Sequence, residues 1–241
     1  MRVSAAMPLI RSAILLVLLA VSAKAWAARP MITDDARIVD PKSCQVESWA
    51  RYDRHGSYEL WTVPSCNPTG NFEISVGGGL QLQGGAGRLA DSLMQAKTVL
   101  RPLRTNDWGL AVSVSRSVER GLESGSRDIA SYNLNVPVTQ SLRDDALLLH
   151  ANAGLREDRV ARRTYATWGL GSELTLRERV QLIAEVYGES GSRPFVHGGL
   201  RYWLVPDRVQ MDTTIGAQAR FGGGVRWFTI GVRVLSPAFL P

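Results

Sequence analysis

The chain has 241 residues, of which 45% are hydrophobic and 21% are charged, and its formal net charge is +6. Three basic residues, Arg2, Arg11 and Lys24, lie in an N-terminal stretch without acidic residues, so the rest of the chain has an excess of only three positive charges. This small excess gives no reason to expect a nucleic-acid partner. A chain of this length suits one all-β domain as well as two small domains.

The first 27 residues have the order of features found in a secretory signal peptide. Arg2 and Arg11 precede the apolar run 13–21, and residues 23–27 offer small side chains at the spacing that a signal peptidase reads. The run is shorter than the roughly 20 apolar residues of a spanning helix, so an uncleaved anchor is the less favoured alternative. No later stretch approaches that length. We therefore predict a signal peptide at 1–27 and a protein exported beyond the inner membrane.

Cys44 and Cys66 are the only cysteines. In an oxidising compartment they predict a single disulfide. Two cysteines cannot form a tetrahedral structural metal site alone, and no histidine lies near them at ligand spacing. The sequence therefore predicts a disulfide and neither a metal site nor another cofactor.

Residues 28–43 contain Pro30 and the pair Asp40-Pro41 and have no sustained periodicity. We interpret them as an irregular periplasmic segment or plug that precedes a β-barrel domain at 44–241. Within that domain, twelve runs are predicted as strands: 44–53, 57–64, 70–83, 92–101, 107–118, 128–139, 145–156, 163–175, 179–188, 194–204, 207–217 and 224–235.

Within most of these runs the apolar residues share one parity. Successive side chains of a strand point to opposite faces, so each such run has one apolar and one polar face. The pattern is clearest across 180–214, where the polar parity collects Glu185, His197, Arg201 and Asp212. The first two runs are the poorest, because their aromatic residues do not settle on one parity.

The connections between the runs fall into two classes. Short, polar, turn-forming sequences follow the second, fourth, sixth, eighth and tenth runs, for example Leu176-Arg177-Glu178 and Val205-Pro206-Asp207. Looser segments rich in Gly, Ser and Arg follow most of the odd-numbered runs. Outer-membrane barrels have short turns on the periplasmic rim and longer loops on the other. Up-and-down wiring then places Cys44, Cys66 and the C-terminus on the periplasmic rim.

These regularities predict an all-β fold, an antiparallel up-and-down transmembrane β-barrel of about 12 strands. Runs of 10 to 12 residues suit tilted membrane-spanning strands better than the five or six residues usual in globular sheets. Closure also removes exposed sheet edges. The alternative is a soluble exported β-domain that binds a ligand or partner. The low aromatic content of 7% and the absence of a terminal aromatic residue are the features that fit a membrane barrel least.

The sequence Thr33-Asp34-Asp35, followed by Cys44-Gln45-Val46-Glu47, resembles the start of the outer-membrane proteins grouped under the meta-pathway of phenol degradation. The motif covers only the N-terminal segment and the first strand. The resemblance implies an outer-membrane barrel of a Gram-negative bacterium with a transport role for small, aromatic compounds. It brings no residue-level substrate site.

The polar parity gives the candidate site residues, which are expected to line the lumen. Such groups either pair across the interior and close it, or line a polar pathway, and the sequence does not choose between these. The lumen candidates are Glu73, Lys97, Arg101, Asn133, His150, Glu185, His197, Arg201, Asp212 and Arg233.

The predicted function is a passive channel or an uptake protein for a small solute, with outer-membrane lipid as its surroundings. An outer-membrane lipid hydrolase is less favoured, because it needs a Ser beside a His on the outer face, and His150 and His197 fall on the lumen parity. There is no Gly-x-Ser-x-Gly elbow. The glycines at 77–79 precede no helix and are better explained as strand residues than as a phosphate loop. We therefore predict no catalytic residues.

Overall fold

The computed structural model describes residues 31–54, 56–82, 88–121, 128–159, 162–219 and 224–241. The predicted signal peptide and parts of four predicted loops lie outside these residues. The described chain forms twelve strands, which are β1 (Ser43–Asp53), β2 (Tyr58–Asn67), β3 (Phe72–Leu82), β4 (Arg88–Arg101), β5 (Trp108–Gly121), β6 (Ile129–Leu142), β7 (Leu147–Asp158), β8 (Arg163–Arg177), β9 (Val180–Glu189), β10 (Phe195–Val205), β11 (Val209–Gln218) and β12 (Arg226–Leu235).

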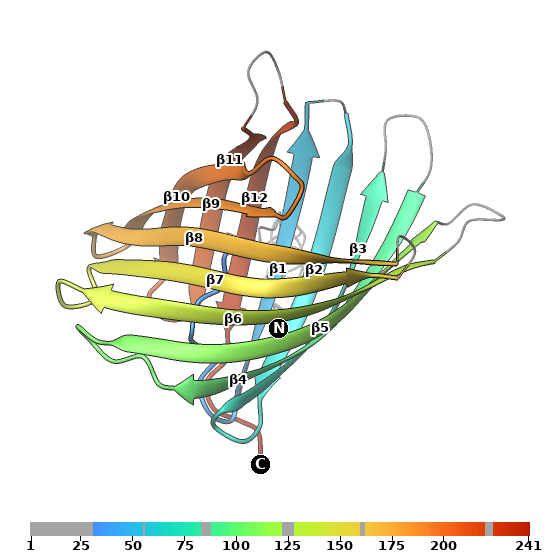
Figure 1. Ribbon diagram of the computed structural model, residues 1–241. Coiled ribbons are helices and arrows are strands. Elements are labelled where there is room, and N and C mark those ends of the chain that lie inside the picture. Colours follow the sequence, from blue (N-terminus) through green and yellow to red (C-terminus); the bar gives the residue numbers. More distant parts are fainter. Residues whose placement is uncertain (1–30, 55, 83–87, 122–127, 160–161, 220–223) are drawn as a thin grey trace, which may run out of the picture.

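The strands close into one barrel (Figure 1). Each strand pairs antiparallel with its neighbours in sequence, and β1 pairs with β12, as in Trp49 opposite Gly231. The predicted antiparallel up-and-down barrel with about twelve strands is therefore confirmed. No helix within the described residues is long and apolar enough to cross a membrane.

The side chains alternate between an outer face and a lumen face along every strand. On β3, Ile74, Val76 and Leu80 are exposed on the outside, whereas Glu73 and Ser75 are buried inside. The same parity continues around the barrel, and the outer face is mostly large and apolar. The alternation inferred from the sequence is therefore that of the structure.

The first two strands follow the same rule, although their sequences obscured it. Trp49 on β1 and Trp61 on β2 are direct partners, and both rings lie inside the barrel. Their centroids are 5.6 Å apart, and their planes differ by 8°. A Cβ on Gly79 of β3 would lie 2.6 Å from the Trp61 ring, so the glycine run makes room for this aromatic pair rather than binding phosphate.

Several predicted turns are shorter than expected. The strand β2 continues through Cys66 to Asn67, and β6 continues through Leu142, so residues predicted as turns are paired. The remaining turn residues compensate with left-handed backbone, as Arg143, Asp144 and Asp145 have φ of 55°, 56° and 65°. Asp is among the non-glycine residues that tolerate this conformation best, and such turns reverse the chain in few residues.

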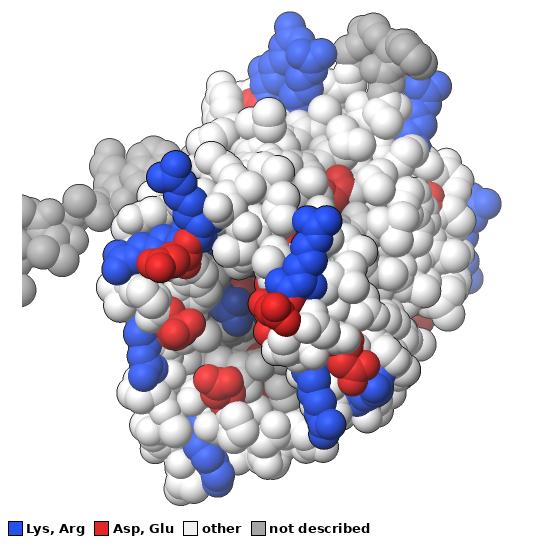
Figure 2. All heavy atoms as spheres, turned by 90° about the vertical axis from the view of Figure 1, so that its left-hand side faces the viewer, with Lys and Arg blue, Asp and Glu red and all other residues white. Residues whose placement is uncertain are grey.

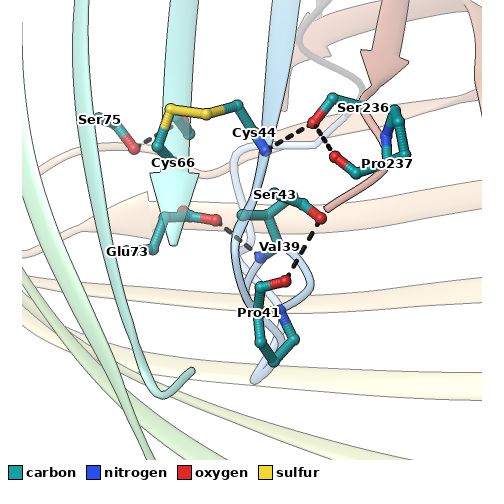
Figure 3. The surroundings of a disulfide bond; sticks show 10 residues. Val39, Pro41, Ser43, Cys44, Cys66, Glu73, Ser75, Ser236 and Pro237 are labelled. Carbon is teal, nitrogen blue, oxygen red and sulfur yellow. Dashed lines mark hydrogen bonds between the residues drawn. A yellow bond between two sulfur atoms is a disulfide. The ribbon is translucent and has the colours of Figure 1, made fainter. Parts of the chain in front are cut away.

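The short connections 68–71, 102–107, 143–146, 178–179 and 206–208 define the turn end of the barrel, and the opposite end is called the loop end. The disulfide between Cys44 and Cys66 links β1 and β2 at the turn end, which confirms the predicted pairing (Figure 3). The C-terminus lies there as well, since the backbone N–H of Ser236 donates to the carbonyl of Cys44 at 2.8 Å.

Candidate lumen site

Residues 31–42, here called the N-terminal segment, run inside the barrel from the turn end. Five of their backbone N–H groups donate to side chains of the wall. The N–H groups of Ile32 and Thr33 bond to Glu185, that of Asp34 to Asn152, that of Ala36 to Thr139 and that of Val39 to Glu73. Because the segment has no regular secondary structure, the barrel wall provides partners that a strand neighbour would otherwise supply.

Glu185 on β9 is the first centre of this contact. Its carboxylate accepts from the N–H of Thr33 at 2.7 Å and from that of Ile32 at 2.9 Å. The imidazole of His197 on β10 lies 2.8 Å from the same carboxylate, and its other nitrogen lies 2.6 Å from the hydroxyl of Thr214 on β11. Three neighbouring strands therefore hold one end of the segment.

Lys97 on β4 binds the middle of the segment. Its ammonium lies 2.8 Å from the Asp34 carboxylate and 2.8 Å from the Asp35 carbonyl oxygen. Burial would raise the pKa of the Asp35 carboxyl, but Arg37 and Lys97 outweigh it and hold that pKa below its ordinary value. The Asp35 carboxylate is thus held in its ionised form by these two cations.

A second ionic cluster lies beside the segment. Arg201 on β10 contacts Asp212 on β11 at 2.9 Å and Glu173 on β8 at 2.8 Å. Arg37 of the segment approaches Glu173 at 3.6 Å. His150 on β7 lies 3.5 Å from the same carboxylate. A buried cation between two buried carboxylates satisfies charges that are costly to leave alone.

Near the turn end, the segment is held by Glu73 on β3 and Asn67 on β2. The Glu73 carboxylate accepts from the Val39 N–H at 2.8 Å (Figure 3), and the Asn67 amide donates to the Val39 carbonyl oxygen at 2.7 Å. Arg233 on β12 lies close by, where it donates to Gln45 at 2.7 Å.

Two glycines of β8 provide the space that the segment occupies. A Cβ on Gly169 would lie 2.6 Å from the hydroxyl oxygen of Thr33, and one on Gly171 would lie 2.4 Å from the end of Met31. The fit continues along the segment, because Ala36 is only 1% exposed. The wall is thus shaped for these residues as well as bonded to them.

Nine of the ten lumen candidates point inward, and Arg101 does not. A bulge between Val99 and Arg101 shifts the register of β4 against β5 and changes the face to which Arg101 points. Its guanidinium stacks on Trp108, 3.9 Å from the ring centroid, and contacts Asp107 at 2.8 Å. The prediction for Arg101 is therefore wrong, because a strict alternation cannot anticipate a bulge.

The other nine candidates are divided between two places. Asn133 lies on the wall of a cavity toward the loop end, and His197 borders both this cavity and the segment. The remaining seven surround the segment or its ionic clusters. The list of candidates left out Asn152, Thr139 and Glu173, although they have the same lumen parity and are as closely involved.

The cavity toward the loop end has a volume of about 600 Å³. Its floor is formed by Ile32, Thr33 and Asp34, and Gln218 borders it near the loop end. A smaller cavity of about 130 Å³ borders the segment near Arg233. Figure 2 shows the other end of the barrel, the turn end, on which β6 and β8 end. Basic and acidic side chains alternate there around a hollow.

The hydroxyl, imidazole and carboxylate of Thr214, His197 and Glu185 are connected in the order of a hydrolase triad. The Thr214 side chain is only 2% exposed, and the carboxylate also accepts two backbone N–H groups of the segment. A nucleophile must reach its substrate. The arrangement therefore anchors the segment. Among the described residues, no group of three or more His, Cys, Asp or Glu side chains is arranged for a metal ion.

A family model described as "Uncharacterised conserved protein UCP029691" matches residues 14–235. The chain belongs to this family. The UCP029691 match does not bear on the resemblance to the phenol-degradation family, which stays a prediction. No curated protein matches the chain.

Solved structures share the fold of this UCP029691 member. The "KdgM porin in complex with disordered oligogalacturonate" has a TM-score of 0.60 and 12% identity, and the match covers 80% of this chain and 98% of that one. The NanC porin has a TM-score of 0.56 and 10% identity, with 80% and 100% covered. At such identities the likeness shows a common barrel fold and carries no residue-level role.

Proposed function

We propose that this protein is an outer-membrane β-barrel of a Gram-negative bacterium that passes small solutes. The observation that carries the proposal is the closed barrel whose outer face is apolar on every side and whose lumen is polar. In lipid, all backbone groups must be paired within the structure, and a closed barrel meets that requirement. Its outer surface then faces lipid, and its turn end faces the periplasm.

The height of the apolar surface supports this placement. The outward side chains of β6 run from Tyr132 to Leu142, which is ten residue steps. At about 3.3 Å per residue and a tilt of about 40°, these steps span about 25 Å, as in other outer-membrane barrels. Outward aromatic residues such as Tyr52 and Trp108 lie toward opposite ends of their strands. They are suited to the two interfaces.

The N-terminal segment is proposed to act as a plug. It occupies the lumen near the turn end, with the cavity of about 130 Å³ beside it, and the cavity of about 600 Å³ begins on its loop-end side. On this proposal, passage of a solute requires displacement of the segment. KdgM and NanC are porins, which supports a channel role for the fold that this chain shares with them.

Heat-dependent migration after detergent extraction tests the membrane placement. A folded barrel should stay compact in unheated detergent and migrate differently after boiling. A soluble exported β-domain, the alternative, would be recovered monomeric without detergent, and that result would refute the proposal.

Planar-bilayer recording tests the channel role. The wild-type protein should be closed most of the time, with discrete openings when the segment leaves. The substitution Glu185→Gln should lengthen the openings. If both proteins insert and neither conducts, the barrel is a packed structural protein and the channel proposal is wrong.

We also propose that the protein is not an enzyme. This rests on the burial of Thr214 and the anchoring use of Glu185. Hydrolysis of phospholipid or ester substrates by the purified barrel, lost in His197→Ala, would contradict it.

A further inference from the structure

The cavity above the segment has one aromatic wall. Trp49, Trp61, Tyr187, Phe195 and Trp227 line it, from β1, β2, β9, β10 and β12. Tyr187 and Phe195 are stacked with centroids 5.5 Å apart, and Phe195 meets Trp227 edge-on at 5.7 Å. Because these rings hold one another in place, the wall is a preformed surface for a flat apolar ring face.

The opposite wall is a ladder of small uncharged polar side chains. Gln95 lies on β4, Ser113, Ser115 and Ser117 on β5, and Asn133 and Asn135 on β6. The Asn133 amide donates to Ser115 at 3.4 Å, and the Asn135 amide donates to Asn152 at 3.0 Å. Hydroxyl and amide groups both donate and accept hydrogen bonds, so they suit a ligand with many hydroxyl groups.

The floor of the cavity is formed by the N-terminal segment and adds no further polar contact from Thr33. The hydroxyl oxygen of Thr33 is buried and has no hydrogen-bond partner among the described residues. Thr33 borders the cavity, only 4% exposed. A Cβ on Gly169 would lie 2.6 Å from this oxygen, so the hydroxyl lies against β8 beneath the floor and is closed off from a ligand in the cavity.

Among the described residues, both arginines that line the cavity are paired with a carboxylate. Arg156 contacts Glu189 at 2.9 Å, and Arg51 contacts Glu59 at 3.6 Å and lies over Trp227 at 4.9 Å. Toward the loop end, Asp91 and Glu119 are direct partners across β4 and β5, both on the lumen parity. Two facing carboxylates disfavour an anion beside them.

We infer that the cavity binds short, uncharged carbohydrates, which are the solutes that the channel admits. A pyranose ring has an apolar C–H face for the aromatic wall and hydroxyl groups for the polar ladder. The volume of about 600 Å³ lies within the roughly 300–1,000 Å³ of small-ligand pockets. This inference rests on the proposed channel function for its role in transport, but binding is measured without conduction.

Tryptophan fluorescence of the mature protein, folded in a detergent without a sugar headgroup, measures the binding. Maltose, cellobiose and lactose are the neutral probes, digalacturonate is the acidic probe, and benzoate and phenol are the aromatic probes. At least one neutral disaccharide should change the emission saturably, with a Kd of about 1 mM or lower. Stronger binding of digalacturonate or of an aromatic probe, or no saturable change with any disaccharide, would overturn the inference.

Matched variants assign the signal to the cavity. Trp61→Phe and Asn133→Ala should each raise the Kd of the neutral disaccharide at least tenfold. Trp108→Phe, at an exposed residue of the outer face, should leave its Kd unchanged. Equal weakening by all three would overturn the inference. If the barrel conducts but binds no disaccharide, only the inferred ligand class is wrong. If it binds a disaccharide but never conducts, the proposed function is wrong.

Discussion

Replacing Glu185 with Gln should release the N-terminal segment. The carboxylate accepts from the N–H groups of Ile32 and Thr33 and contacts His197 at 2.8 Å. Gln keeps the shape but removes the charge and turns one acceptor into a donor that faces another donor. A hydrogen bond to a charged group contributes about 1.5–3 kcal/mol. Because the adjoining cavity admits water to the freed groups, we expect a net loss of about 3 kcal/mol, or roughly a hundredfold in the seated-to-displaced ratio.

Hydrogen exchange and conductance measure this shift together. Amides of residues 31–42 should exchange about a hundredfold faster in Glu185→Gln, and the open fraction in planar bilayers should rise in parallel. Glu189→Gln is the matched control, since Glu189 lies on the same strand and face but pairs with Arg156 at 2.9 Å. Unchanged exchange in Glu185→Gln, or equal acceleration in Glu189→Gln, would refute the account of how the segment is held.

Three further substitutions, two of them with a control variant, test other parts of the structure. Leu134→Lys places a charge on the outer face and should lower the free energy of unfolding in vesicles by about 2–4 kcal/mol. Its control is Asn133→Lys at the preceding, lumen-facing position, which should change that free energy by less than about 1 kcal/mol. Arg201→Leu leaves Asp212 without a cation and Glu173 with only the more distant Arg37, and should lower that free energy by about 3–5 kcal/mol. An unchanged free energy of unfolding would count against a buried cluster. Gly169→Val should displace Thr33 and raise the open fraction in bilayers, while Gly188→Ala, whose Cβ meets its nearest neighbour at 3.4 Å, should leave conductance as in the wild type.

The barrel was predictable because the alternation of apolar and polar residues that specifies it is local in the sequence. Each outward apolar residue alternates with an inward polar one, so parity can be read strand by strand without knowing which strands pair. The turn residues then give the order, and consecutive antiparallel pairing follows. Trp49 and Trp61 obscured the first two strands, because a large lumen admits apolar side chains on its inner face when glycines opposite them, such as Gly79, make room.

The contacts of the N-terminal segment were not predictable in the same way. Residues 31–42 have no periodicity, and their partners come from strands separated by up to 153 residues in sequence, as for Ile32 and Glu185. Such contacts depend on the register and radius of the closed barrel. The place of Arg101 depends on a single bulge in β4, which has no clear sequence signal.

The sequence left two alternatives for the lumen, paired charges or a polar pathway. In the structure, charges pair around the N-terminal segment, and the cavity above it is lined by aromatic rings, uncharged polar groups and two arginine–carboxylate pairs. Because Ile32, Thr33 and Asp34 belong to the segment and also form the cavity floor, a ligand on that floor and the seated state of the segment are thermodynamically linked. A ligand that contacts this floor only when the segment is seated stabilises the closed barrel. A ligand opens the channel only if it binds the displaced state more tightly, for example by taking the place of Ile32 and Thr33 beside Glu185.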